Sequence, residues 1–277
     1  MNHLTVVVTG ASSGIGVAAA EGFARQGARV ALVGRDPARL DEALSTVRAA
    51  AAPDREPRAF RVDFEVLDDV RRLAGELAEA YPTIDVLCNN AGMVSPGRQT
   101  TVDGYERTMQ TNHLSPFLLA NLLRERLRGG RIIVTASDAH TGGALDPEHP
   151  GSPERYRPFT VYGSSKQANI LFAAEAARRW PDILSASYHP GVVRTRFGRD
   201  SAVIGTFIRL AFFLRTPTKG ADTMLWLAGT PRDELTNGGY YVDRKRREPS
   251  GIANDPKAAA RLWETSAEAV GVPPGAA

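Results

Sequence analysis

The chain has 277 residues, 43% hydrophobic and 23% charged, a balance typical of a folded globular protein and not of a disordered one. Its 34 basic residues exceed its 31 acidic residues by only three and show no cluster, so we expect no nucleic-acid partner. The single cysteine, Cys88, excludes an internal disulfide and no apolar run reaches membrane-spanning length, so we expect a cytoplasmic protein with no membrane span.

Strand-like and helix-like patterns alternate along most of the chain. Short apolar runs predict buried strands at residues 4–8, 29–33, 58–62, 84–88, 131–135 and 184–188. Helical spacing predicts helices at 14–25, 37–52, 65–80, 104–128 and 161–179, with an irregularity near Pro116. A short aromatic strand at 240–242 and a helix at 256–270 follow. This order predicts an α/β fold with a doubly wound parallel sheet of about seven strands and helices on both faces.

Two segments interrupt the alternation. Residues 142–158 are rich in Pro, Gly and charge, and we interpret them as a surface insertion. Residues 201–214, SAVIGTFIRLAFFL, are strongly apolar and follow the sixth strand. A substrate lid over about 198–216 and a dimer or core contact both explain such a segment, because apolar lids and apolar interfaces have the same composition.

A glycine-rich turn follows the first strand, in the sequence TGASSGIG from Thr9 to Gly16. Small residues let the backbone approach a pyrophosphate, and the following helix N-terminus offers free N–H groups. The first two glycines are spaced more widely than in the common dinucleotide pattern G-x-G-x-x-G. The residues predicted to bind a cofactor here are Gly10, Ser12, Ser13, Gly14, Ile15 and Gly16.

The end of the second strand indicates which nicotinamide cofactor is bound. An enzyme that selects NAD usually places a carboxylate there, whereas this chain has Gly34 followed by Arg35. A guanidinium suits a 2′-phosphate, so NADP(H) is favoured over NAD(H). The competing interpretation of Arg35 is a solvated surface charge, and Asp36 is predicted to cap the next helix.

Tyr162 and Lys166 lie four residues apart in a predicted helix, so their side chains share one face. The pKa of a free tyrosine is about 10, and a neighbouring ammonium is expected to lower it, which would make Tyr162 an acid/base group. Ser137 follows the fifth strand and is predicted to orient a carbonyl oxygen, with Thr135 as the competing hydroxyl. Two histidines, His113 and His140, are interpreted as structural, and no metal site is predicted.

These motifs, together with the NNAG sequence at 89–92 and PGVVRT at 190–195, resemble the short-chain dehydrogenase/reductase family from Thr5 to about Val242. The long interval from Ser137 to Tyr162 and the sequences NHLSPFLL, SSKQANILF and ARLWETSAEAVG are similar to its retinol dehydrogenase/WW-domain oxidoreductase branch. The resemblance implies one NAD(P)-binding Rossmann-fold domain over residues 1–277. It also implies a homo-oligomer.

The same resemblance assigns further residues. Asn112 would join Ser137, Tyr162 and Lys166 in the catalytic group, and Asp63 would contact adenine. The remaining cofactor contacts would come from Asn89, Ala91, Gly92, Tyr162, Lys166, Pro190, Val193 and Thr195.

The function expected from the resemblance is an NADP(H)-dependent oxidoreductase that interconverts an alcohol and an aldehyde or ketone of a lipophilic small molecule. One alternative is a non-catalytic NADP(H)-binding regulatory protein on the same fold. Another is epimerisation or dehydration of a nucleotide sugar, but the chain is too short for the larger C-terminal domain of such enzymes.

Overall fold

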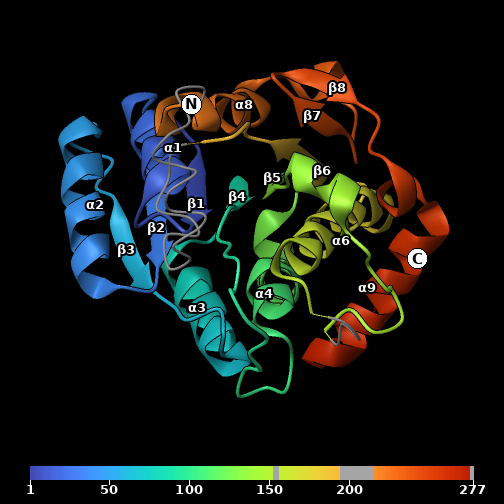
Figure 1. The fold of residues 1–277 in the computed structure, drawn as a ribbon. Helices are drawn as coiled ribbons and strands as arrows, with labels where there is room; N and C mark the ends of the chain where they lie inside the picture. The colour runs from blue at the N-terminus through green and yellow to red at the C-terminus, as the bar shows by residue number, and fades with distance from the viewer. Residues whose placement is uncertain (152–155, 194–214, 275–277) are drawn as a thin grey trace.

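The computed structural model describes residues 1–151, 156–193 and 215–274, and within them an eight-stranded sheet carries helices on both faces (Figure 1). The strand order is β3-β2-β1-β4-β5-β6-β7-β8. The strands are β1 (Thr5–Thr9), β2 (Arg29–Gly34), β3 (Arg58–Arg61), β4 (Val86–Asn89), β5 (Arg131–Thr135), β6 (Leu184–His189), β7 (Tyr240–Val242) and β8 (Lys245–Arg247). Neighbours from β3 to β7 are parallel, and β8 runs antiparallel to β7. The predicted doubly wound α/β fold is confirmed.

The helices form one layer on each face of the sheet. One layer contains α1 (Gly14–Arg25), α2 (Pro37–Ala50) and α8 (Pro217–Gly229). The other contains α3 (Leu67–Ala80), α5 (Ser115–Leu122), α6 (Pro158–Arg179) and α9 (Pro256–Val270). Strand β1 shows why two layers are needed, because Val6 and Val8 pack toward α1 while Val7 packs toward α3. A strand that is apolar on both sides is stable only between two covering layers.

The helix predicted over 104–128 is divided into four pieces. A short α4 (Arg107–Met109) leads into a π-helical turn, η1 (Gln110–Leu114), and then into α5, with Pro116 in its first turn. A 3₁₀ turn, η2 (Arg124–Leu127), completes the segment. The predicted irregularity is therefore a π-helical turn just before Pro116. Such turns occur frequently at functional sites.

Two elements were not predicted. Helix α8 has an N-terminal signal, since Thr216 caps it through the Lys219 amide and Pro217 follows. Strand β8 is the exposed sequence Lys-Arg-Arg and has no apolar pattern, and it pairs with β7 through a turn at Asp243 and Arg244, whose φ angles are 50° and 63°. A basic edge strand discourages pairing with other chains. Further 3₁₀ turns are η3 (Asp138–Gly142), η4 (Arg232–Glu234) and η5 (Gly251–Asn254).

The two interrupting segments differ in what the structure describes. Residues 142–151 are described, and Leu145 is buried there with its amide donating to Gln167 Oε1 on α6 at 3.0 Å. The Thr265 hydroxyl of α9 donates to the carbonyl oxygen of Pro147 at 2.7 Å. This part of the predicted insertion is thus anchored on two helices. The apolar segment 201–214 and Thr195 lie outside the described residues.

The sheet order reverses between β1 and β4, which are neighbours although β2 and β3 lie between them in sequence. In open α/β sheets, ligands bind at the carboxyl ends of the strands beside such a reversal. Among the described helices, none is long and apolar enough to cross a membrane.

Candidate active site

The glycine-rich turn lies at this reversal and packs tightly on the end of β4. Gly10 has a φ of +67°, and a Cβ there would stand 2.9 Å from the Ala91 Cα. A Cβ on Gly16 would stand 2.2 Å from the carbonyl oxygen of Gly10, so only glycine allows α1 to begin so close to the turn. Ser13 precedes α1 and its side chain does not cap the helix, which leaves the first N–H groups of α1 for a ligand.

Thr9 and Asn90 brace the turn against β4. The Thr9 hydroxyl donates to the Cys88 carbonyl at 3.1 Å and accepts from the amides of Asn90 and Ala91 at 2.9 Å each. The Asn90 side chain donates to the Thr9 carbonyl at 2.9 Å. Asn89, which the sequence singled out, instead donates to the Pro116 carbonyl at 3.4 Å. Sequence reasoning missed Thr9 and Asn90, although both lie within the recognised motifs.

Arg35 directly follows β2, where its side chain is 58% exposed and its guanidinium is paired with a carboxylate. Its Nη1 is 2.6 Å from Glu65 Oε1 and 3.9 Å from Asp63 Oδ1. Glu65 also accepts from Arg107 Nη2 at 2.8 Å. Asp36 caps α2 through the Arg39 amide, as predicted. Arg35, which the sequence predicts to bind a 2′-phosphate, is therefore a surface charge in an ion pair.

Asp63, which the family resemblance predicts to contact adenine, has a local structural role. Its Oδ1 accepts the Glu65 amide at 3.0 Å, so it orders the turn before α3. Its side chain remains 38% exposed beside Arg35 and is accessible to a ligand.

Tyr162, Lys166 and Ser137 meet at the carboxyl end of β5. A hydrogen bond joins the hydroxyl groups of Ser137 and Tyr162. Lys166 Nζ lies 5.3 Å from the centre of the Tyr162 ring and donates to the Thr135 carbonyl at 3.0 Å. Thr135 directs its own hydroxyl to Asn90 and Tyr188, each at 3.3 Å. Of the two competing hydroxyls, Ser137 is thus the one that reaches Tyr162.

Burial controls the protonation of this group. Burial raises the pKa of Tyr162 to about 12, and the hydrogen bond with Ser137 opposes the rise. Burial also lowers the pKa of Lys166 to about 8. The expectation of a lowered tyrosine pKa is wrong, because loss of solvation raises the pKa of Tyr162. Tyr162 is a neutral phenol at pH 7.

Asn112 lies in the π-helical turn and is fully engaged by hydrogen bonds. Its Oδ1 accepts from the Met93 amide at 2.7 Å, and its Nδ2 donates to the Met93 carbonyl and to Ser165 Oγ, each at 2.9 Å. A Cβ on Gly92 would stand 3.3 Å from Asn112 Oδ1 and 3.5 Å from Lys166 Nζ. The structure thus brings Asn112, Gly92 and Lys166 together beside Tyr162.

Pro190 and Val193 follow β6, at the same edge of the sheet where β1, β4 and β5 end. Val193 forms a bridge with Arg215, and the Arg215 amide donates to the Val192 carbonyl at 2.8 Å. A Cβ on Gly220 would contact both Val193 and Ile15, so the segment after β6 lies over the start of α1. The glycine-rich turn and the segment after β6, which lie far apart in sequence, are therefore neighbours.

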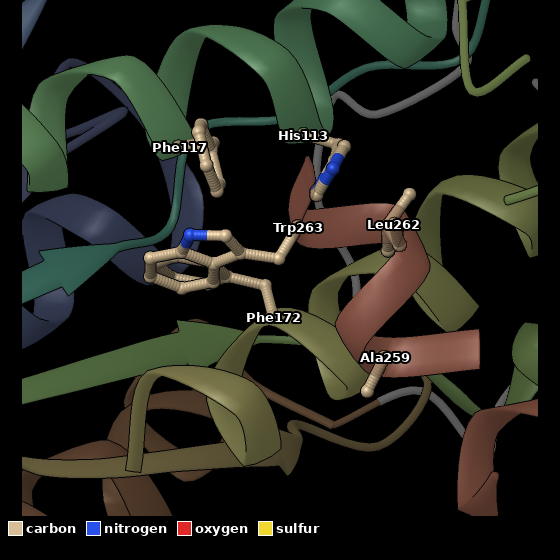
Figure 2. Close-up of a pocket in the computed structure, with 6 residues that line it drawn as sticks. All are labelled: His113, Phe117, Phe172, Ala259, Leu262 and Trp263. Atoms are coloured by element: carbon tan, nitrogen blue, oxygen red, sulfur yellow. The ribbon is translucent and has the colours of Figure 1, made fainter. Parts of the chain in front are cut away.

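The two histidines set aside from the sequence are buried. His113 Nε2 lies 2.8 Å from Ser266 Oγ, and burial lowers its pKa to about 3, so its ring is neutral. Figure 2 shows it at the edge of a crevice too narrow for water, where the Trp263 indole stacks on Phe172 and Phe117 packs nearby. His140 Nδ1 donates to the Ser137 carbonyl at 2.8 Å. Both have structural partners.

The residues present suit a nicotinamide dinucleotide. The glycine turn forms a cradle that a Cβ would fill, at an uncapped helix N-terminus. Lys166 is 3% exposed and makes one hydrogen bond within the described residues, which leaves two ammonium N–H groups available for ribose hydroxyls. A buried ammonium with unused donors is a site built for a polar ligand.

Comparisons with known proteins agree with the family resemblance of these motifs. The model of the short chain dehydrogenase family matches residues 4–202. A protein of Streptomyces sp. (strain C5) named "Putative daunorubicin C-13 ketoreductase DnrU" is 56% identical over 268 residues, covering 96% of this chain and 92% of that protein. Mouse retinol dehydrogenase 14 is 37% identical over 292 residues, covering 98% and 87%.

Two solved structures show the same architecture. An uncharacterized protein from Mycobacterium paratuberculosis superposes with a TM-score of 0.80 at 31% identity, covering 97% of this chain and 94% of that one. A short chain dehydrogenase from Burkholderia cenocepacia J2315 in complex with NADP has a TM-score of 0.69 at 25% identity, covering 86% and 95%. The chain therefore belongs to the short-chain dehydrogenase family of oxidoreductases, which bind a nicotinamide cofactor, and it is retinol dehydrogenase-like, as its sequence predicted.

Proposed function

We propose that this protein is an NADP(H)-dependent carbonyl reductase for a bulky lipophilic ketone or aldehyde, with Tyr162 as the acid. The observation that carries the proposal is the hydrogen bond between the Ser137 and Tyr162 hydroxyls beside a buried Lys166. A non-catalytic binding protein would have no chemical need for a phenol, a buried ammonium and a hydroxyl at one point.

The cofactor, when bound, supplies the hydride that adds to the carbonyl carbon. Tyr162 gives its proton to the carbonyl oxygen, which becomes the hydroxyl of the product alcohol, and a phenolate remains. A phenol is a suitable donor here because its pKa is about 12, so it is fully protonated at pH 7. Ser137 donates a hydrogen bond that orients the carbonyl oxygen. Lys166 stabilises the phenolate, and Asn112 holds the backbone beside Lys166 while the proton is restored from solvent.

Preference for NADP(H) rests on Arg35. The residue before it, Gly34, has no side chain, so no acid occupies the position that usually holds the ribose of NAD. In this proposal the 2′-phosphate competes with Glu65 for the Arg35 guanidinium. Gly10, Ser12, Ser13, Gly14, Ile15 and Gly16 hold the pyrophosphate, and the remaining contacts come from Asp63, Asn89, Ala91, Gly92, Pro190, Val193 and Thr195.

The relatives' names indicate which substrates to try. The Streptomyces relative is named for the C-13 ketone of daunorubicin, and the mouse relative for retinol. The higher identity to the former favours a polycyclic ketone. We further propose one cofactor-binding domain over residues 1–277, assembled as a homo-oligomer in the cytoplasm, where the buried thiol of Cys88 stays reduced.

The test is consumption of NADPH or NADH by the purified protein with daunorubicin, and reduction of NADP⁺ or NAD⁺ with retinol. Turnover of daunorubicin with NADPH preferred over NADH is the expected result. Turnover that prefers NADH would refute the role of Arg35. Tight binding of NADPH without turnover of any carbonyl would favour the alternative function, an NADP(H)-binding regulator. Light scattering of the same sample measures its molar mass and so gives the oligomeric state.

A further inference from the structure

The backbone around Ser137 is tied to the end of β6 on both sides of the serine. The Ala136 amide donates to the Tyr188 carbonyl at 2.8 Å. The Asp138 amide donates to His189 Nδ1 at 3.2 Å, and His189 Nε2 lies 3.1 Å from Asp138 Oδ2. One imidazole thus contacts both the backbone and the side chain of the residue after Ser137.

These contacts assign the tautomer of His189. An amide N–H can only donate, so Nδ1 must be the unprotonated nitrogen that accepts from Asp138. The proton of the neutral ring then sits on Nε2, which lies 3.1 Å from the Asp138 carboxylate. Protonation of Nδ1 would set two donors against each other and remove the bond to the Asp138 amide.

The surroundings of His189 favour the neutral ring. Its side chain is 8% exposed, and burial lowers its pKa below the 6.5 of a free histidine. Arg215 and His140 lower the pKa further, whereas the carboxylates of Asp138 and Asp243 oppose this. The hydroxyl of Tyr240, from β7, also faces His189 and Asp138, and it donates to Asp138 Oδ1 at 3.3 Å.

The position of His189 in the chain connects two parts of the site. It is the last residue of β6, and Pro190, which begins the segment proposed to contact the cofactor, follows directly. Ser137 is also held by His140, whose Nδ1 donates to the Ser137 carbonyl. The His140 contact fixes the backbone after the serine through η3, whereas His189 fixes it against the sheet.

We propose that His189 is a positioning residue that clamps Asp138 through both ring nitrogens and thereby holds the Ser137 hydroxyl against Tyr162. The clamp rests on the proposed function, in which Ser137 orients the carbonyl oxygen. His189 does not contact the reacting atoms. Its effect appears in the catalytic rate and in the mobility of the Asp138 amide.

The kinetic test compares His189→Leu, His189→Asn and a control, His149→Leu. The Leu variant loses both contacts to Asp138, and kcat is expected to fall by about 10- to 100-fold, because a displacement of about 1 Å in a catalytic group has that effect. The Asn side chain can accept from the Asp138 amide at the position of Nδ1, so it should recover most of kcat. His149 also pairs with an aspartate, Asp146, but is 72% exposed, and its variant should match the wild type. NADPH affinity should change by less than about 2-fold in all three.

The pH profile separates positioning from a merely structural role. In the wild type, kcat should decline below pH 6.5 as His189 is protonated and the Asp138 amide loses its acceptor. The His189→Asn variant cannot titrate, so this acid limb should disappear. An unchanged acid limb in this variant, or an unchanged kcat in His189→Leu, would overturn the proposal.

Amide hydrogen exchange at Asp138, followed by NMR with NADPH bound, tests the clamp without turnover. Exchange should accelerate by about 10-fold or more in His189→Leu and remain slow in His189→Asn. Equal protection in all variants would refute the clamp even if the protein is an active reductase. Suppose that exchange accelerates in His189→Leu but the wild-type protein reduces no carbonyl. That result would support the clamp and refute the proposed function. If His189→Leu does not fold, the pH profile of His189→Asn decides the matter: loss of the acid limb supports the clamp, and an unchanged acid limb refutes it.

Discussion

The two ends of the proposed cofactor site are built differently. The catalytic corner, defined by Ser137, Tyr162 and Lys166, is held by internal hydrogen bonds, and Lys166 is 3% exposed. The adenosine corner, defined by Arg35, Asp63 and Glu65, lies at the surface, and the side chain of Arg35 is 58% exposed. The end proposed for catalysis is thus shielded from water at Lys166, whereas the end proposed to bind adenosine is open to solvent.

The difference in burial predicts a difference in energy. Charges and hydrogen bonds in a water-excluded site act with full strength, and their loss has large effects. An exposed ion pair is screened by solvent and salt, and typical pairs of this kind contribute about 0–1 kcal/mol. Substitutions in the catalytic corner should therefore abolish function or shift stability strongly. Those in the adenosine corner should change cofactor preference in a graded, salt-sensitive way.

The largest effect is expected for Tyr162→Phe. Removing the only proposed proton donor should lower kcat for carbonyl reduction by about 10²- to 10⁴-fold while NADPH binding persists. Steady-state kinetics and fluorescence titration of NADPH measure the two quantities. Tyr105→Phe is the matched control, because the Tyr105 hydroxyl donates to the Ala269 carbonyl on α9 instead. A Tyr162→Phe enzyme with near-normal kcat would show that another group supplies the proton.

Lys166→Met should separate stability from activity. Burial holds the pKa of Lys166 at about 8, below the 10.5 of an exposed lysine, so the unfolded chain binds more protons between these values. The free energy of unfolding of the wild type should therefore rise from pH 8 to pH 10.5. The methionine variant should lose activity yet be more stable at pH 7 by up to about 3 kcal/mol, an advantage that shrinks as the pH rises.

Urea denaturation at pH 7 and pH 10 measures this prediction. The exposed Lys245 of β8 provides the control variant Lys245→Met, which should show little change at either pH. A Lys166→Met protein that is less stable than the wild type at pH 7 would mean that the hydrogen bond to the Thr135 carbonyl outweighs the desolvation of the ammonium.

Arg35→Ser should redirect cofactor preference. Loss of a charge-assisted contact to the 2′-phosphate should raise KM for NADPH by about 10- to 100-fold, while KM for NADH changes by less than about 3-fold. Steady-state kinetics with both cofactors at low and high salt provide the measurement. Arg39→Ser is a suitable control, because Arg39 is similarly exposed and pairs with Asp36. Equal changes in KM for NADPH and for NADH would show that Arg35 affects only the structure of the site and does not contact the 2′-phosphate.

The two corners also differ in how far the sequence predicts them. Tyr162 and Lys166 are four residues apart, so helix geometry alone places them together, and the strand that ends before Ser137 brings the serine to them. The bounds of α1, β5, β7 and α9 follow equally local signals, namely glycine turns, apolar runs and an aspartate cap. Local patterns predict local structure well.

Contacts between distant residues were not predictable. The pair of Arg35 with Glu65 joins positions 30 residues apart, and Asn90 reaches Thr9 across 81 residues. Each depends on the packing of separate strands, which no periodicity encodes. The raised pKa of Tyr162 is of the same kind, because the spacing to Lys166 is visible in the sequence whereas the loss of solvation is not.

The smallest effect, and the sharpest test of the adenosine corner, is expected for Glu65→Gln. Glu65 neutralises Arg35 and places a negative charge beside the proposed 2′-phosphate, so its removal should lower KM for NADPH by about 2- to 5-fold. KM for NADH should stay constant, and the gain should fade at about 0.5 M salt, where exposed charges are screened. A higher KM for NADPH would mean that Glu65, held in turn by Arg107, orients Arg35 for the phosphate instead of competing with it. In that case the adenosine corner would be preorganised like the catalytic one, and exposure alone would not distinguish the two.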